Sequence, residues 1–597
     1  MLHVPTLMAG LDRGVLWLLA PLSAAILVSG LDDLAVDLMW AFTWFKDRLI
    51  PSARLFPPGE RQLDSAPRRR IAILLPLWKE HRVIGEMLEH NLAAIRYDAY
   101  DIFAGVYPND LETGEAVAKL AHRFKNVHLA AVPHDGPTSK ADCLNWVFQH
   151  LLIEEESRGE PFDIVMVHDA EDLIHPEELR WINYYAARFD FIQTPVLPLA
   201  TPFREITHGL YCDDFAENHT RDMTVRPRFG GFVPGAGVGT GFRRDALERL
   251  AIASGNRIFD PEALTEDYAN GLRMFRLGCR QTFVPLLWNR GTNDFVATRE
   301  FFPRKWRAAL RQRSRWITGI ALQGCQQFGW RGTPGEIYWL WRDRKALIGN
   351  PMNLMASAVF CYGLATAIWT RVSAGAAELA VATLALQMLR FAIRMGCSAR
   401  VYGLGFALGA PVRALYGNVL NCAATMHALA GYSMARIRGE RLRWLKTDHA
   451  YPTRAALLEH KRRLGEILVG SGQLTAAALS AALETLPAAI RLGEHLVGTG
   501  RLSADEVYDA LSFQQGLPRA RIEPEAVSPQ VAHALPIRTA REWKVLPFRV
   551  AEGSLFLAGP EIPSVEMSRA LQGFTALELK FHLVTPDEFE VLSSALL

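Results

Sequence analysis

The chain has 597 residues, of which 50% are hydrophobic and 21% charged, and its 65 basic and 63 acidic side chains leave a formal net charge of +2. This composition excludes a mostly disordered chain, and the near-zero charge argues against a dedicated nucleic-acid-binding protein. Seven cysteines without a C-x-x-C pair exclude a disulfide scaffold and favour a reducing compartment. The mean hydropathy of +0.05 predicts membrane and soluble segments in one chain.

The first apolar segment lies near the N-terminus. Residues 14–31 carry no charge and lie between Arg13 and Asp32-Asp33, a length at the minimum for crossing a ~30 Å hydrocarbon core. A cleaved signal peptide is the alternative, but no small-residue cleavage motif precedes the aspartates. We therefore expect residues 1–67 to form a transmembrane anchor and a juxtamembrane segment.

Residues 68–330 alternate short apolar runs with helical stretches, which predicts an α/β domain. We expect strands at 71–75, 102–107, 127–132, 164–167 and 191–194, and helices at 83–95, 112–124, 140–153 and 176–188. Ligands of such sheets bind beyond the carboxyl ends of the strands. Polar residues follow three of these ends, in Trp78-Lys79-Glu80, Asn109-Asp110 and His168-Asp169-Ala170-Glu171-Asp172.

Two carboxylates after the fourth strand form a candidate metal site. Asp169 and Glu171 are two residues apart on a turn, so both can reach one Mg²⁺ or Mn²⁺, which prefers carboxylate and phosphate oxygens. Such a cation would neutralise a diphosphate leaving group. The alternative is an acidic turn or helix cap without a metal.

Two further motifs follow, Thr265-Glu266-Asp267 and Gln312-Arg313-Ser314-Arg315-Trp316. Asp267 is a candidate general base for an attacking sugar hydroxyl. In a helix, Gln312, Arg315 and Trp316 share one face, where tryptophan offers a flat surface to a sugar and arginine binds phosphate. The alternative is a basic amphipathic helix on anionic lipid.

Residues 331–445 contain three more apolar runs, at 346–370, 372–389 and 414–435. We expect the first two to form a pair of membrane spans. The third contains Asn418, Asn421 and His427 and is expected in the interface, with an extra pair of crossings as the alternative. Basic residues gather at 46–70, 299–315 and 436–446, which the positive-inside rule places on the cytoplasmic side.

After an expected linker at 446–460, the chain contains an internal repeat. Residues 463–483 and 491–511 align at an offset of 28 with 12 of 21 positions identical. Each unit predicts a helix, a glycine-containing turn and a second helix. A small bundle in which the glycines only cap helices is the alternative to a ligand site.

The ordered motifs between residues 68 and 435 resemble the processive family 2 glycosyltransferases, such as cellulose and hyaluronan synthases. The resemblance implies a GT-A fold between transmembrane helices and a single inverting displacement on a UDP-sugar. It implies a nucleotide-sugar site with Trp78, Glu80, Asp110, Lys140 and Asp169, a metal site with Asp169 and Glu171, and a catalytic set with Glu266, Asp267, Gln312, Arg315 and Trp316. The family's motif has aspartate where Glu171 stands, so whether Glu171 or Asp172 is the second metal ligand stays open.

The repeat resembles the MshEN domain of type II secretion and pilus ATPases, which we expect over 461–597 as the helical repeat followed by a small α/β half. The resemblance implies cyclic di-GMP as an allosteric activator. It implies ligand contacts from Arg463, Leu464, Gly465, Arg491, Leu492, Gly493 and Gln514. The first motif has Leu486 where the second has Gln514, and so lacks one polar contact.

A membrane transferase joined to this domain resembles the phage adsorption protein B group of bacterial inner-membrane proteins. The resemblance implies a multi-pass protein with cytoplasmic catalytic and C-terminal domains. Such a protein would use a UDP-sugar, for example a UDP-N-acetylhexosamine such as UDP-N-acetylmannosamine, to extend a growing glycan as a surface exopolysaccharide. The expected partners include membrane lipid and an outer-membrane export partner, but no nucleic acid. Two alternatives are a non-catalytic cyclic di-GMP receptor or scaffold and a non-processive transferase to a lipid carrier.

Overall fold

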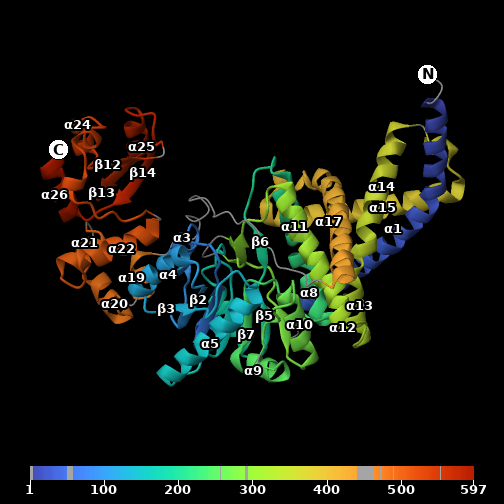
Figure 1. The fold of residues 1–597 in the computed structure, drawn as a ribbon, viewed down its shortest axis with the longest axis horizontal. Helices are drawn as coiled ribbons and strands as arrows, with labels where there is room; N and C mark the ends of the chain where they lie inside the picture. The colour runs from blue at the N-terminus through green and yellow to red at the C-terminus, as the bar shows by residue number, and fades with distance from the viewer. Residues whose placement is uncertain are drawn as a thin grey trace. The chain divides into compact units, whose positions relative to one another are not determined.

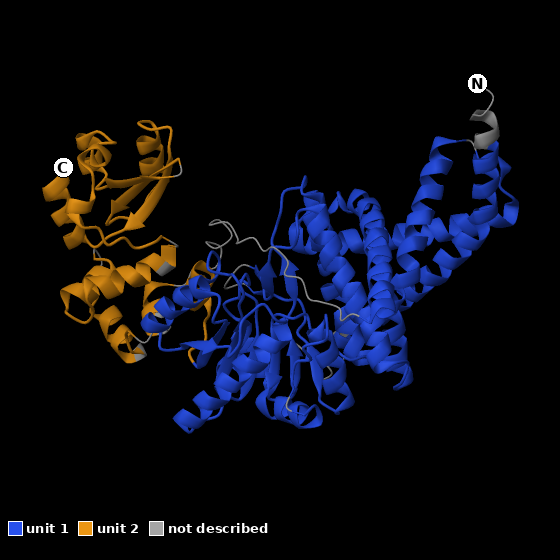
Figure 2. Ribbon diagram, viewed as in Figure 1, with its two compact units in different colours: residues 1–84, 99–452 blue, residues 85–98, 453–597 orange. Residues whose placement is uncertain are grey.

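The structure is a computed structural model that describes residues 4–49, 58–255, 257–289, 294–366, 368–439, 463–470, 473–487, 490–515, 517–551 and 553–597. It divides into two compact units, residues 1–84 with 99–452 and residues 85–98 with 453–597 (Figure 2). The expected linker at 446–460 lies outside the described residues.

A seven-stranded mixed sheet forms the centre of the first unit, in the order β3-β2-β1-β4-β7-β5-β8 (Figure 1). Its strands are β1 (Ile71–Pro76), β2 (Tyr100–Val106), β3 (Val127–Ala131), β4 (Ile164–Val167), β5 (Phe191–Gln193), β7 (Thr240–Arg243) and β8 (Gln281–Phe283). Only β7 runs antiparallel to its neighbours in this sheet. The apolar run in β1 is buried on both faces, as expected of a central parallel strand. The α/β GT-A class predicted from the sequence is confirmed.

Helices pack against this sheet and two short strand pairs border it. The helices are α4 (Leu111–Arg123), α5 (Lys140–Arg158), α6 (Glu178–Ala186), α9 (Arg244–Ala253) and α10 (Glu266–Arg276). On α5, Leu144, Val147 and Leu151 lie on one face and enter the core. The strand pairs are β6 (Val196–Pro198) with β11 (Thr298–Glu300), which are parallel, and β9 (Trp288–Asn289) with β10 (Asp294–Phe295).

The remaining elements of this unit are mostly helical. They include α1 (Val4–Leu49), α2 (Glu60–Asp64), α7 (Ile206–Glu217), the π-helix η2 (Asn218–Asp222), α8 (Met223–Val225), α11 (Trp306–Ile317), α12 (Gly324–Phe328), α13 (Pro334–Arg344), α14 (Ala346–Ala365), α15 (Ala374–Tyr402), α16 (Leu404–Ala407) and α17 (Ala410–Arg438). Helix α1 packs against α14 and α15, and α17 packs against α11, α14 and α7.

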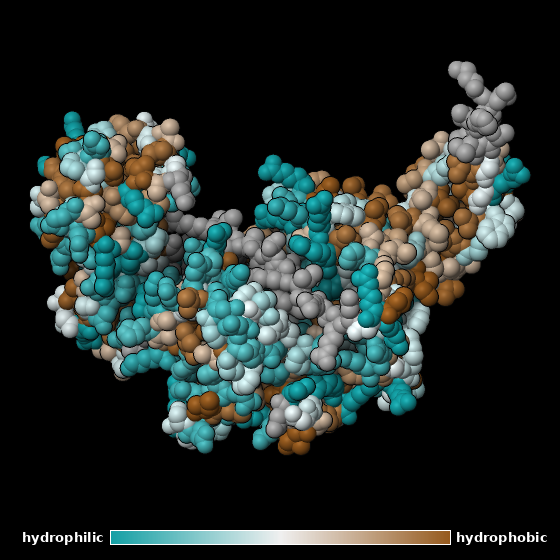
Figure 3. All heavy atoms as spheres, in the orientation of Figure 1, coloured by the Kyte–Doolittle hydropathy of each residue, from teal (hydrophilic) through white to brown (hydrophobic). Residues whose placement is uncertain are grey.

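Two helices in the described part of the chain are long and apolar enough to cross a membrane, Ala9–Asp47 within α1 and Ala374–Tyr402, which is α15. Hydrophobic side chains gather on the surface of α1, α14 and α15 (Figure 3), including Trp17, Ile348 and Val381. The span predicted at 346–370 is shorter than expected, because α14 ends at Ala365 and a 3-10 turn (Ile368–Arg371) follows. Asparagines and Pro351 also lower the hydropathy of α14.

The second unit contains helix α3 (Ile84–Ala94) from residue 85 onward and the C-terminal region. The repeat forms α19 (Leu464–Gly470), α20 (Ala476–Glu484), α21 (Leu492–Gly498) and α22 (Ala504–Gln515), around a core that includes Leu468, Leu496 and Val507. A three-stranded sheet of β12 (Leu546–Ala551), β13 (Ser554–Gly559) and β14 (Glu578–Leu583) follows, with α23 (Pro529–Ala532), α24 (Ile537–Glu542), α25 (Val565–Gln572) and α26 (Pro586–Leu596). A helical repeat before a small α/β half is the predicted arrangement.

Candidate functional site

The carboxyl ends of β1, β2 and β4 border a cavity of about 610 Å³. Its lining includes the predicted residues Trp78, Glu80, Lys140, Asp169, Glu171, Glu266, Asp267, Gln312, Arg315 and Trp316. A larger hollow of about 2360 Å³ lies between α5, α9 and the end of α17, but neither the acidic motifs nor the α11 motif line it. The candidate active site is therefore the smaller cavity.

One end of the cavity is an aromatic corner. The rings of Trp78 and Tyr107 meet edge to face with centroids 5.4 Å apart. A Cβ atom at Gly136 would lie 2.7 Å from the Trp78 ring, so this loop approaches the indole as only glycine can. Tyr107, which the sequence analysis did not select, lines the cavity, and its hydroxyl is 2.7 Å from Thr138 Oγ1.

Asp110 has a different place from the one expected. It is buried and is not among the residues that line the cavity. Its carboxylate accepts a hydrogen bond from the backbone N–H of Lys79, whose φ of 54° lies in the left-handed region. Asp110 therefore fixes the strained turn that presents Trp78 and Glu80.

Lys140 is the first residue of α5, after Ser139, whose hydroxyl accepts a hydrogen bond from Asp142 N–H and caps the helix. Its ammonium lies 2.6 Å from Asp169 Oδ1 and 3.0 Å from the carbonyl oxygen of Gly237. Burial lowers the pKa of Lys140, but Asp169 and Glu266 outweigh it and raise the pKa above its usual value. The cavity thus holds one fixed positive charge beside the acidic turn.

A buried cluster of charged side chains supports the turn after β4. Asp172 Oδ2 accepts hydrogen bonds from Asp169 N–H and from His168 Nδ1, both at 2.9 Å, and His168 Nε2 lies 3.4 Å from Glu178. Although burial lowers the pKa of His168, Asp172 and Glu178 raise it to about 9. Asp172 is fully buried and does not line the cavity, whereas Asp169 and Glu171 do.

These positions fit a divalent cation bound by two protein carboxylates. Asp169 and Glu171 are oxygen donors in one cavity, beside room for a ligand, and Mg²⁺ commonly takes one or two carboxylates plus substrate phosphates. In the described part of the chain, no group of three or more His, Cys, Asp or Glu side chains is arranged as a metal site. A metal here would therefore need phosphate or water oxygens to complete its coordination.

Glu266 and Asp267 form the first turn of α10 on another wall of the cavity. Asp267 Oδ1 accepts a hydrogen bond from Tyr268 N–H at 2.8 Å. A Cβ atom at Gly237, where φ is 81°, would lie 3.0 Å from Asp267 Oδ2, so a glycine loop covers this carboxylate. Burial and the adjacent Asp267 raise the pKa of Glu266 to about 7, and burial also raises the pKa of Asp267.

The α11 motif presents its predicted face to the same cavity. Gln312 Oε1 and Arg315 Nε are buried and have no hydrogen-bond partner within the residues that the structure describes. Trp316 lies beside Tyr211 and Phe302, with ring centroids 6.0 and 6.4 Å away. Buried polar atoms without partners next to an aromatic platform are suited to a polar, ring-shaped ligand.

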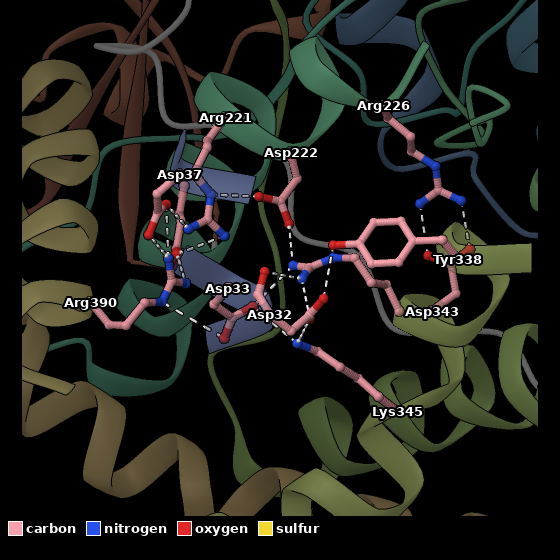
Figure 4. A network of polar contacts seen from close by, with 12 residues as sticks. Asp32, Asp33, Asp37, Arg221, Asp222, Arg226, Tyr338, Asp343, Lys345 and Arg390 are labelled. Carbon is pink, nitrogen blue, oxygen red and sulfur yellow. Dashed lines mark hydrogen bonds and ion pairs between the residues drawn. The ribbon is translucent and has the colours of Figure 1, made fainter. Parts of the chain in front are cut away.

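The cavity is also lined by Asp222, Arg342 and Lys345, which belong to a network of charged side chains (Figure 4). Arg342 pairs with Asp32, Asp33 and Asp222, and Lys345 Nζ lies 2.7 Å from Asp32. The network continues through Arg221, Asp37 and Arg390 (Figure 4). This network of charges joins the N-terminal helix α1 to η2 and α13.

Glu300 is another cavity residue that the sequence analysis missed. It ends β11, a strand of three residues, which carries no periodic signal. Burial and the carboxylates of Asp172, Glu171 and Asp169 raise its pKa well above the usual value.

In the second unit, the repeat places equivalent residues in equivalent environments. Arg463 and Arg491 are exposed and directly precede α19 and α21. A Cβ atom at Gly465 or Gly493 would lie 2.7 Å from Leu479 or Val507, so these glycines allow close helix packing. Leu464 and Leu492 pack against the core of the repeat, and Gln514 is half-buried near the end of α22.

Comparison with known proteins agrees with this architecture. Residues 67–319 match the family described as glycosyltransferase like family 2, and residues 515–596 match the MshEN domain. The chain therefore contains a domain of the glycosyltransferase family 2 type and an MshEN domain, which is a cyclic di-GMP-binding domain.

The chain is 33% identical over 568 residues to bacteriophage adsorption protein B of Escherichia coli strain K12, covering 90% of this chain and 76% of that protein, and equally to bacteriophage N4 adsorption protein B of E. coli O157:H7. It belongs to the bacteriophage adsorption protein B family. Among solved structures, MshE with cdg is 23% identical over 23% of this chain and 100% of that chain, with a TM-score of 0.21. The mannosyltransferase PcManGT from Pyrobaculum calidifontis, in complex with GDP-Man and Mn²⁺, is 17% identical over 67% of this chain and 99% of that chain, with a TM-score of 0.41.

Proposed function

We propose that the protein is a multi-pass inner-membrane glycosyltransferase that uses a UDP-sugar to extend a glycan and is activated by cyclic di-GMP. The observation that carries the proposal is the single cavity shared by the aromatic corner, the Asp169/Glu171 turn, Asp267 and the α11 motif. Trp78 provides a face for the uracil base, and Lys140 at the start of α5 lies where a diphosphate meets a helix N-terminus.

Each group has a role in a single displacement. Asp267 accepts the proton of the acceptor hydroxyl while that oxygen bonds to the anomeric carbon, and the bond from that carbon to the diphosphate breaks, releasing UDP with inversion. Arg315 and Lys140 balance the charge that develops on the diphosphate. Mg²⁺ or Mn²⁺, held by Asp169 and Glu171, supplies further charge neutralisation when bound. Trp316 and its aromatic neighbours support the acceptor sugar.

The membrane part of the proposal rests on α1 and α15, the apolar surface around them, and the basic clusters that favour a cytoplasmic catalytic domain. The relatives are named for bacteriophage adsorption, which fits a product at the cell surface, such as an exopolysaccharide exported through an outer-membrane partner. The regulatory part rests on the MshEN domain and on the exposed, equivalent Arg463 and Arg491.

The test is UDP release by the purified full-length protein in detergent with Mg²⁺ or Mn²⁺, across a panel of UDP-sugars and with and without cyclic di-GMP. We expect UDP release from one class of UDP-sugar, the UDP-N-acetylhexosamines. The rate of release should be higher with cyclic di-GMP. Product length then separates a processive polymer from a single transfer. Absence of release with every donor, or unchanged turnover in Asp267→Asn, would overturn the proposal.

A further inference from the structure

Glu300 belongs to the wall between the acidic turn and the acceptor platform. Strand β11 pairs with β6, and Arg299, one residue earlier, forms an antiparallel bridge with Leu173, just after the turn. The two backbone hydrogen bonds of this bridge, Leu173 N–H to Arg299 O and Arg299 N–H to Leu173 O, are 2.8 and 3.0 Å long. The position of Glu300 is therefore fixed relative to the turn that carries Asp169 and Glu171.

Thr298 and Glu300 are the first and last residues of β11 and lie on the same face of the strand. Side chains two residues apart on a strand lie on the same face. Thr298 donates a hydrogen bond to Glu178, which lies under the acidic turn. Glu300 shares the face of Thr298 and lines the cavity, as does Phe302, which lies two residues after the end of β11 and packs near Trp316.

Glu300 forms no side-chain hydrogen bond or ion pair within the described residues. It also does not combine with Asp169 and Glu171 into a three-carboxylate metal site, since no such group occurs in the described parts of the chain. A carboxylate that faces a cavity without a partner is stabilised when a ligand brings hydrogen-bond donors. The hydroxyl groups of a sugar are neutral donors of this kind.

We propose that Glu300 is a specificity-determining residue whose carboxylate accepts a hydrogen bond from a hydroxyl of the donor sugar. Its place between the proposed diphosphate site and the Phe302–Trp316 platform is where the transferred sugar must lie. The inference rests on the proposed function and adds to it a residue that recognises the donor sugar directly.

The test compares the sugar nucleotide with UDP alone in the full-length protein. In Glu300→Ala, we expect kcat/KM for the preferred UDP-sugar to fall by about 10- to 100-fold, because the truncation leaves a buried sugar hydroxyl without its hydrogen-bond partner. The competitive inhibition constant of UDP should stay within about two-fold, which also reports that the site is folded. Glu300→Gln keeps the side-chain volume and should show a smaller loss of the same kind. Glu248→Gln, an exposed carboxylate on α9 outside this cavity, is the matched control and should leave both values unchanged.

Donors that lack one hydroxyl sharpen the test. Among 3-, 4- and 6-deoxy analogues of the UDP-sugar, one should have a kcat/KM with the native protein that is lower by a similar factor. In Glu300→Ala, the same analogue should lower kcat/KM by no more than about two-fold further, because the substitution and the missing hydroxyl remove the same hydrogen bond. Native-like turnover in Glu300→Ala, a parallel rise in the UDP inhibition constant, or full additivity for all three analogues would overturn the inference.

Failure of the proposed function gives a different result. If the native protein releases no UDP from any donor, calorimetric binding of UDP-sugar and UDP replaces the kinetics. The inference then holds only if Glu300→Ala weakens UDP-sugar binding and spares UDP, and fails if both or neither change.

Discussion

Glu171 and Asp172 are adjacent buried carboxylates of which only Glu171 lines the cavity, and exchanging each for its amide separates their roles. Asp172 is buried against His168, and removing one partner of a buried ion pair costs about 3–5 kcal/mol. At about 2–4 °C per kcal/mol for a domain of this size class, Asp172→Asn should lower the melting temperature by at least about 6 °C. Glu171→Gln should leave it unchanged or raise it slightly, because the substitution removes a charge from a crowded acidic cluster.

The metal affinity should show the reverse pattern. Glu171→Gln replaces a charged carboxylate at the cavity wall by a neutral amide and should weaken Mn²⁺ binding in the presence of UDP by at least about 10-fold. The assays are differential scanning fluorimetry of the full-length protein and electron paramagnetic resonance of unbound Mn²⁺. Full Mn²⁺ affinity in Glu171→Gln, or a melting temperature within about 1 °C of native in Asp172→Asn, would refute the assignment of Asp172 to the support of the turn.

Three further predictions concern the base and the sensor. Asp267→Asn should lower the rate of UDP release by about 10²- to 10⁴-fold while the UDP inhibition constant stays near native, because the general base is lost but nucleotide binding is not. Comparable changes in the rate and in the inhibition constant would contradict this role of Asp267. The value of kcat/KM should decrease as the pH is lowered below about 7. Burial and Asp267 raise the pKa of Glu266 to about 7, and the pair of Glu266 and Asp267 must lose its proton before Asp267 accepts another. A value of kcat/KM that stays constant from pH 6 to 8 would disprove this coupling. In the helical repeat, Leu486→Gln should tighten cyclic di-GMP binding, and Arg491→Ala should weaken it by about 10-fold or more. Calorimetry measures both affinities, and equal affinity in the two variants would count against a ligand site in the repeat.

The sheet could be predicted from the sequence because buried strands such as Ile71–Pro76 are short, continuous apolar runs between polar turns. The cavity residues could be predicted from motif order, since the carboxyl ends of β1, β2 and β4 lie at one edge of the sheet. The supporting role of Asp110 could not, because it depends on the left-handed turn at Lys79. Glu300 was missed because a three-residue strand has too few positions to show alternation.

Contacts between distant segments were equally hidden from the sequence. Asp32 and Asp33 were recognised only as the boundary of an apolar run, yet their partners are Arg342 and Lys345, about three hundred residues later. No local pattern encodes such a pairing. Similarly, the sequence predicts ligand contact for the paired glycines of the repeat but does not reveal that both allow helices to pack closely.

The ion network of Figure 4 has a practical consequence for studying the enzyme as a soluble fragment. Asp32, Asp33 and Asp37 are among the counter-charges of Arg221, Arg342, Lys345 and Arg390. A catalytic fragment cut from residue 58 onward would keep these cations and lose the three aspartates. Glu217 and Asp222 would remain as partners of Arg221, Arg342 and Arg390, so the network would be left with more buried cations than carboxylates. Solubilising the catalytic domain by deleting its N-terminal helix would therefore damage the catalytic domain itself.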